Sequence, residues 1–138
     1  MTAEYSKPLP RPLNPEFTRP FWEATKRHEL IMPRCTMCDH LFFYPRSECP
    51  CCLSSNIAWA PVSGRGRLYS FTIVNQPAHS AFRDDAPHVY AIVQLDEGPR
   101  MISNVVECDH ADLQVDMPLV AVFDDVTPEW TLVKFKPA

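Results

Sequence analysis

The chain has 138 residues, with 13 basic against 17 acidic side chains, 46% hydrophobic residues and 6 cysteines. That hydrophobic fraction is too high for a disordered chain, and the length suits one ordinary domain or two very small ones. No apolar run is long enough to cross a bilayer and the N-terminus lacks the apolar core of a secretory signal, so we expect a cytoplasmic protein with no membrane contact. In that compartment clustered cysteines hold a metal more often than a disulfide.

Residues 1–32 are expected to form an extended arm followed by a helix. Pro8, Pro10 and Pro12 favour polyproline II, so the arm is either a disordered tail or a segment that wraps a partner or the body of the protein. The helix is predicted over residues 15–29, with Thr18 as its N-cap. Its aromatic face is expected to pack against the rest of the chain or against a second subunit.

Five of the six cysteines are clustered. Cys35 and Cys38 form one C-x-x-C pair, and Cys49 and Cys52 form a second pair after ten intervening residues. Two pairs of this kind bring four thiolates into a tetrahedron, which is typical of a structural Zn²⁺ site with every position filled. A rubredoxin-type iron centre would use the same four sulfurs and is the alternative. Cys51 is left over, as an alternative ligand or a free thiol.

The cysteines predict a zinc ribbon over residues 33–56. Leu41 to Tyr44 would form the short strand that joins its two knuckles. His40 is expected to be a surface residue rather than a ligand, because four thiolates are already available. A segment this short has little core of its own, so a metal would supply much of its folding free energy.

Residues 57–138 are predicted to form a small antiparallel barrel. Six runs rich in β-branched and aromatic residues indicate strands, and they begin at Ile57, Gly66, His88, Pro99, Pro118 and Thr131. A tight hairpin is expected at 96–98, a short helical crossing at 110–117 and one long loop at 75–88. The fold class is therefore mainly β: an N-terminal helix and a rubredoxin-like zinc ribbon, then an OB-fold barrel, with a small sandwich as the runner-up.

No catalytic motif stands out in the remainder of the chain. The histidines at 79, 88 and 110 are dispersed, and Cys108 is alone, so these residues are expected to be solvated or structural. Zinc ribbons and OB-folds often bind nucleic acid, but residues 54–138 carry 6 basic and 11 acidic side chains. An acidic barrel argues against that function, because a nucleic-acid surface needs a basic stripe.

The order of these motifs resembles the DUF35 family. The resemblance covers roughly residues 20–137 and is carried by the runs PFWEATKRHELIMPRC, CTMCDHLFFYPRSECPCC, GRGRLYSFTIV, HVYAIVQLDEGPRMISNVV and VKFKPA. Asp39 and Asp116 stand where this family usually has glycine. Aspartate tolerates a left-handed backbone better than most residues, so neither departure changes the predicted fold.

The resemblance implies a small zinc-binding subunit, not catalytic on its own, in an acyl-CoA-processing complex. The first-choice partner is a thiolase-like enzyme, in a hetero-oligomer that could be a heterotetramer, with a coenzyme A thioester as a shared ligand. A MaoC-type hydratase or an aldolase of steroid side-chain degradation is the next partner. The arm and the 75–88 loop, with Phe82 and Arg83, are the candidate contacts. The other hypotheses are a stand-alone acyl-CoA-binding module and an electron-transfer or nucleic-acid-binding protein.

Overall fold

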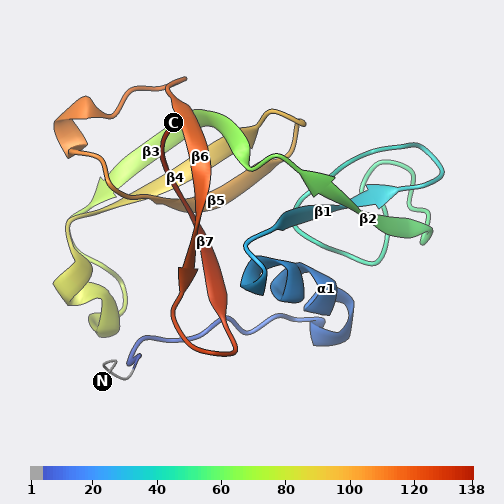
Figure 1. Ribbon diagram of the computed structural model, residues 1–138, viewed down its shortest axis with the longest axis horizontal. Coiled ribbons are helices and arrows are strands. Elements are labelled where there is room, and N and C mark those ends of the chain that lie inside the picture. Colours follow the sequence, from blue (N-terminus) through green and yellow to red (C-terminus); the bar gives the residue numbers. More distant parts are fainter. Residues whose placement is uncertain (1–4) are drawn as a thin grey trace.

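The structure is a computed structural model that describes residues 5–138, so the first four residues of the predicted arm lie outside it. Within the described residues the chain forms one α-helix, a two-stranded sheet and a closed five-stranded barrel (Figure 1). This arrangement confirms the mainly β fold class predicted from the sequence. No helix in the described part of the chain is long and apolar enough to span a bilayer.

Helix α1 spans Pro15–Lys26, so it begins at the predicted residue, whereas the predicted N-cap and the predicted end at residue 29 are wrong. Asn14, not Thr18, is the N-cap: its side chain accepts a hydrogen bond from the Phe17 N–H at 3.4 Å, and Pro15 occupies the first helical position, where its missing N–H costs nothing. The helix ends earlier than residue 29 because His28 adopts a left-handed φ of 60°. That conformation closes the last turn and cannot continue a helix.

Two strands form the sheet beside this helix. Strand β1 (Leu30–Cys35) pairs antiparallel with β2 (Ile57–Val62), from Leu30 opposite Val62 to Cys35 opposite Ile57. The run at 57–62, expected as the first strand of the barrel, therefore belongs to the cysteine-rich module. Between them, Leu41–Tyr44 is not a strand, because only an isolated bridge from Leu41 to Arg34 forms. The predicted domain boundaries, after residue 32 for the arm and helix and after residue 56 for the ribbon, stay predictions.

The barrel has the strand order β3-β4-β5-β7-β6 and closes through β3 and β6. Its strands are β3 (Arg65–Val74), β4 (His88–Leu95), β5 (Arg100–Val105), β6 (Pro118–Asp125) and β7 (Thr131–Pro137). Neighbours are antiparallel except β5 and β7, which run parallel. Short 3₁₀ turns, η1 (Ser80–Asp85) and η2 (His110–Asp112), lie in the connections. The sequence predicts η2 but takes η1 as plain loop.

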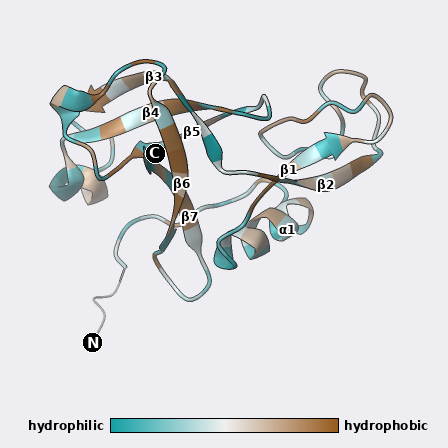
Figure 2. Ribbon diagram, turned by 45° about the horizontal axis from the view of Figure 1, so that its top comes forward, coloured by the Kyte–Doolittle hydropathy of each residue, from teal (hydrophilic) through white to brown (hydrophobic). Residues whose placement is uncertain are grey.

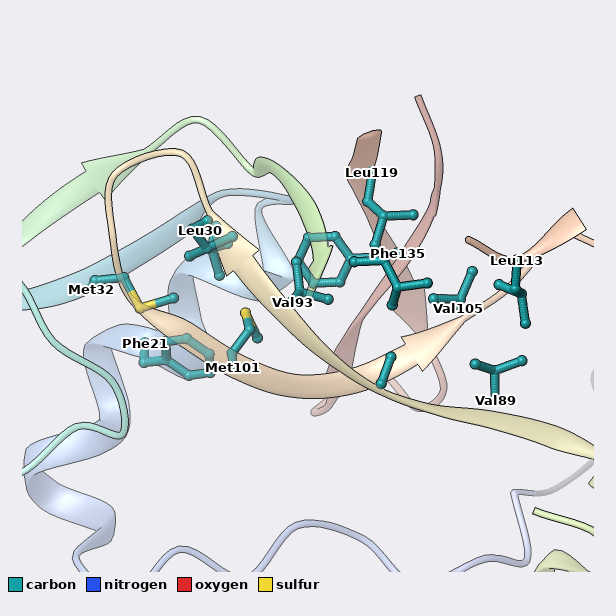
Figure 3. Close-up of a cluster of buried hydrophobic side chains, with 13 residues drawn as sticks. Phe21, Leu30, Met32, Val89, Val93, Met101, Val105, Leu113, Leu119 and Phe135 are labelled. Carbon is teal, nitrogen blue, oxygen red and sulfur yellow. The ribbon is translucent and has the colours of Figure 1, made fainter. Parts of the chain in front are cut away.

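Inward and outward side chains alternate along β4 and β5, and Figure 2 shows the hydrophobic stretches on the barrel strands and on β1 and β2. In β4 the odd-numbered positions from Val89 to Leu95 are buried, while the even-numbered ones face outward. Inside, one cluster extends from α1 through β1 into the barrel (Figure 3). Its buried members are Phe21, Leu30, Met32, Leu68, Val89, Ala91, Val93, Leu95, Met101, Val105, Leu113, Leu119 and Phe135. Because helix, ribbon and barrel share this close-packed core, their relative orientation is fixed.

The arm lies along the body of the protein before it enters α1 (Figure 1). The Lys7 ammonium meets the Asp85 carboxylate of η1 at 2.5 Å, and this contact raises the pKa of Lys7. Of the alternatives that the prolines leave open, wrapping the body is the one adopted by residues 5–14.

Candidate metal centre and adjoining grooves

Two turns of the same construction carry the clustered cysteines. In the first, the Cys35 carbonyl accepts from the Asp39 N–H at 2.9 Å and the Cys35 N–H donates to His40. In the second, the Cys49 carbonyl accepts from the Leu53 N–H at 2.9 Å and the Cys49 N–H donates to the Ser54 carbonyl. Both turns need a left-handed residue four positions after their first cysteine, and Asp39 and Leu53 have the same φ of 64°.

These turns bring four sulfur atoms together. The Sγ atoms of Cys35, Cys38, Cys49 and Cys52 all lie within 4.8 Å of one another, with 3.5 Å between Cys35 and Cys52 and 3.6 Å between Cys38 and Cys49. A tetrahedron of thiolates around Zn²⁺, at about 2.3 Å per bond, has edges of about 3.8 Å. The four cysteines therefore fit a structural zinc ion, and the cluster has the composition and the spacing that the sequence predicts.

Backbone N–H groups favour the thiolate form at two of the four cysteines, Cys35 and Cys49, whose pKa values are lowered. The Cys38 N–H points at the Cys35 sulfur, and the Cys51 and Cys52 N–H groups point at the Cys49 sulfur, at 3.3 to 3.5 Å. The hydrogen bond from Cys38 lowers the pKa of Cys35 to about 7. Zinc binds deprotonated cysteine, so donors already aimed at the sulfurs stabilise the form that the metal requires. With four protein ligands a zinc ion would have no open position, so its contribution would be structural.

The two other residues considered near the cluster do not join it. Cys51 is exposed, and its side chain is not among the four that converge. His40 is also exposed, and its ring stacks on that of Phe42 with 6.0 Å between centroids.

The remaining candidate residues are dispersed, as expected. His79 caps η1 by accepting a hydrogen bond from the Ala81 N–H at 3.0 Å. The thiol of Cys108 donates to the Asp109 carbonyl, and burial raises its pKa. Of the two predicted contact residues, Phe82 is half-buried against a groove while Arg83 is exposed.

Sequence reasoning missed two grooves on the outside of the barrel. The first, which we call the arm-side groove, has a volume of about 820 Å³ and lies between arm residues 10–14, α1, residues 43–47 and the outer faces of β4, β5 and β7. The second, of about 840 Å³, lies under the start of the arm and the 77–88 segment. Both grooves reach Tyr90, Asn104, Leu132 and Lys134, so they adjoin. No single stretch of sequence signals them, because their walls come from segments far apart in the chain.

Comparison with known proteins assigns the two modules. A model of the rubredoxin-like zinc ribbon domain of ChsH2 matches residues 22–58, and a model of the C-terminal OB-fold domain of ChsH2 matches residues 59–124. A chain in the solved structure of an Ltp2-ChsH2(DUF35) aldolase is 33% identical, with a TM-score of 0.81 over 92% of this chain and 98% of that chain.

Two curated proteins show how the module is used elsewhere. The chain is 36% identical over 119 residues to a probable enoyl-CoA hydratase alpha subunit of Thermomonospora curvata, yet spans 37% of the length of that subunit. It is 34% identical over 115 residues to a DUF35 domain-containing scaffold protein of Methanothermobacter thermautotrophicus, which covers 83% of this chain and 86% of that protein. With its four-cysteine ribbon and its OB-fold barrel, the chain belongs to the DUF35/ChsH2 family.

Proposed function

We propose that the protein is a non-catalytic, zinc-binding scaffold subunit of an acyl-CoA-processing complex, and that it pairs with a thiolase-like enzyme. The observation that carries this proposal is the similarity, over nearly the full length of both chains, to a chain of the Ltp2-ChsH2(DUF35) aldolase. A scaffold protein of similar length is also among the relatives of this chain. The acyl thioester of coenzyme A would be held mainly by the partner.

The chemistry of the described residues is consistent with a supporting role. Nucleophilic catalysis by a serine, cysteine or threonine commonly needs a base within hydrogen-bond reach of that side chain. In the part of the chain that the structure describes, no hydrogen bond joins a histidine to such a side chain: His28 bonds Asp125, and His79 bonds a backbone N–H. The four converging cysteines would be saturated by their metal and offer no position to a substrate.

A hydratase subunit is the second candidate partner. It is favoured by the similarity to the alpha subunit from Thermomonospora curvata, in which the matching region is only part of a longer chain.

Co-expression tests the proposal directly. The chain is produced with a thiolase-like protein from its host, or with a MaoC-type hydratase, and the purified material is analysed for stoichiometry, zinc content and thiolysis or retro-aldol activity. We expect a stable complex whose activity requires both chains. A monomer that binds acyl-CoA alone would point to the stand-alone module, and a red, iron-loaded protein would point to electron transfer.

A further inference from the structure

The floor of the arm-side groove is an apolar face of the barrel that is open to solvent. Tyr90 lies opposite Asn104, and Ile102 lies opposite Ile92, so these side chains share the outer side of the β4–β5 pair. Tyr90 and Ile102 are each 44% exposed, and Tyr44, from the loop above them, is 47% exposed. Outward positions of a barrel are ordinarily polar, and a contiguous apolar patch on a soluble protein marks a binding surface.

The charge around this groove has one sign. Arg11, Arg46 and Lys134 line it, and among the described residues no carboxylate does. Lys134 is neutralised by Asp124 at 2.6 Å, whereas Arg11 and Arg46 form no ion pair within residues 5–138. Two free guanidinium groups beside an apolar floor, in a chain of net charge −4, fit an occupant that is itself acidic as well as apolar.

The composition of the walls favours a protein segment as this occupant. Tyrosine, tryptophan, phenylalanine, methionine and arginine are the residue types enriched in protein–protein interfaces, and here they are Tyr44, Trp22, Phe43, Met101 and Arg46. The walls come from a helix and barrel strands that share one core, so most of the site exists before binding and little ordering entropy is lost.

The length of the groove favours an extended segment over a compact ligand. It adjoins the second groove through Tyr90 and Lys134, so a chain lying in one can continue into the other. The arm, which forms one wall, can also adjust. Its residues 5–13 make no backbone–backbone hydrogen bond to the described part of the chain, and the one ion pair that holds them joins Lys7 to Asp85.

We propose that the arm-side groove docks an extended segment of the partner enzyme subunit that carries apolar and acidic side chains, an inference that rests on the scaffold function proposed above. Tyr90 and Ile102 bury against the apolar side chains of that segment, and Arg11 and Arg46 pair with its carboxylates.

The test uses the full chain and its co-purified partner, with dissociation constants measured at low and at moderate salt. Tyr90→Ala should weaken the complex by about tenfold or more, as truncation of a central interface tyrosine does. The double variant Arg11→Glu, Arg46→Glu should weaken it by at least about tenfold at low salt and flatten its salt dependence. Tyr69→Ala and Arg67→Glu are matched controls on β3, because Tyr69 is 45% exposed and neither residue lines either of the two grooves. Both controls should stay within about twofold of the wild type.

Any one of the following three outcomes would overturn the docking proposal. Groove variants that bind the partner as the wild type does, while retaining zinc and a native near-ultraviolet circular dichroism spectrum, would show that the partner docks elsewhere. Loss of octanoyl-CoA binding by Tyr90→Ala with an intact complex would assign the groove to a small amphiphile instead. If the wild-type chain binds neither a thiolase-like enzyme nor a hydratase subunit, the scaffold function falls as well, and this result is distinct from the two others.

Discussion

Removing the metal should disorder the two cysteine knuckles and leave the barrel folded. The perturbation is either a chelator or Cys38→Ser, which takes one of the four converging sulfurs away. Within residues 36–56, the one side chain other than a cysteine that is buried is Phe42. The barrel, in contrast, has its own core around Leu68, Val93 and Phe135. Loss of the metal should therefore disorder residues 36–56 without unfolding the barrel.

The expected size of the effect follows from comparing the free energy gained by burying Phe42 with the free energy gained by binding the metal. Complete burial of one phenylalanine is worth about 1.5–3 kcal/mol. Structural zinc in small peptides contributes about 10–16 kcal/mol of apparent binding free energy. In the knuckles the metal therefore outweighs Phe42 several-fold, and without it nothing comparable holds residues 36–56.

Hydrogen exchange followed by mass spectrometry separates the two regions. In the metal-free protein, peptides from 36–56 should lose nearly all protection, whereas those from 88–105 keep theirs. Cys51→Ser is the matched control: it lies beside a proposed ligand but outside the cluster, so it should retain the metal. Unchanged protection of 36–56 after chelation, or loss of metal from Cys51→Ser as readily as from Cys38→Ser, would refute the reasoning.

Substitutions at three further positions test the barrel by urea denaturation. Phe135→Ala removes a fully buried ring and should lower the free energy of unfolding by about 3–5 kcal/mol, whereas a loss under about 1 kcal/mol would contradict its central place in the core. Gly66→Ala drives a new Cβ into the backbone carbonyl of Gln94, which cannot swing away, and should cost about 1–3 kcal/mol. Asp116→Gly relieves a left-handed φ of 72° and should raise the free energy of unfolding by up to about 1 kcal/mol, while Asp116→Val should lower it; the opposite order would reject the strain.

The knuckles could be predicted because their chemistry is local in the sequence. The spacing of the cysteines alone places four sulfurs together, and the family pattern marks Asp39 and Asp116 as left-handed positions, which both prove to be. Leu53 has the same conformation as Asp39 but was not predicted, since a leucine gives no signal for a positive φ. Its side chain is 77% exposed, which leaves room for the strained turn.

The errors arise where pairing partners, not residue types, decide the structure. Strand β2 has the β-branched and aromatic composition of any other strand, so composition recognised it as a strand but could not choose its neighbour. It pairs with β1 because the second knuckle, which ends just before it, returns the chain to Cys35. Likewise Asn14 and Thr18 are both good N-caps, and the Pro15 that follows Asn14 decides between them.

The metal centre and the arm-side groove are connected through one short segment. Phe43, Tyr44 and Arg46 form a wall of the groove, yet they lie between the two cysteine pairs, in the stretch whose order should depend on the metal. Trp22 and the floor residue Tyr90 belong to α1 and the barrel and should keep their places without the metal. Removal of the metal should therefore weaken binding of the partner even though no proposed zinc ligand lines the groove. Titration of the chelated protein with its partner would show this as a loss of affinity that added zinc restores. Undiminished affinity without metal would mean that the partner does not use this wall.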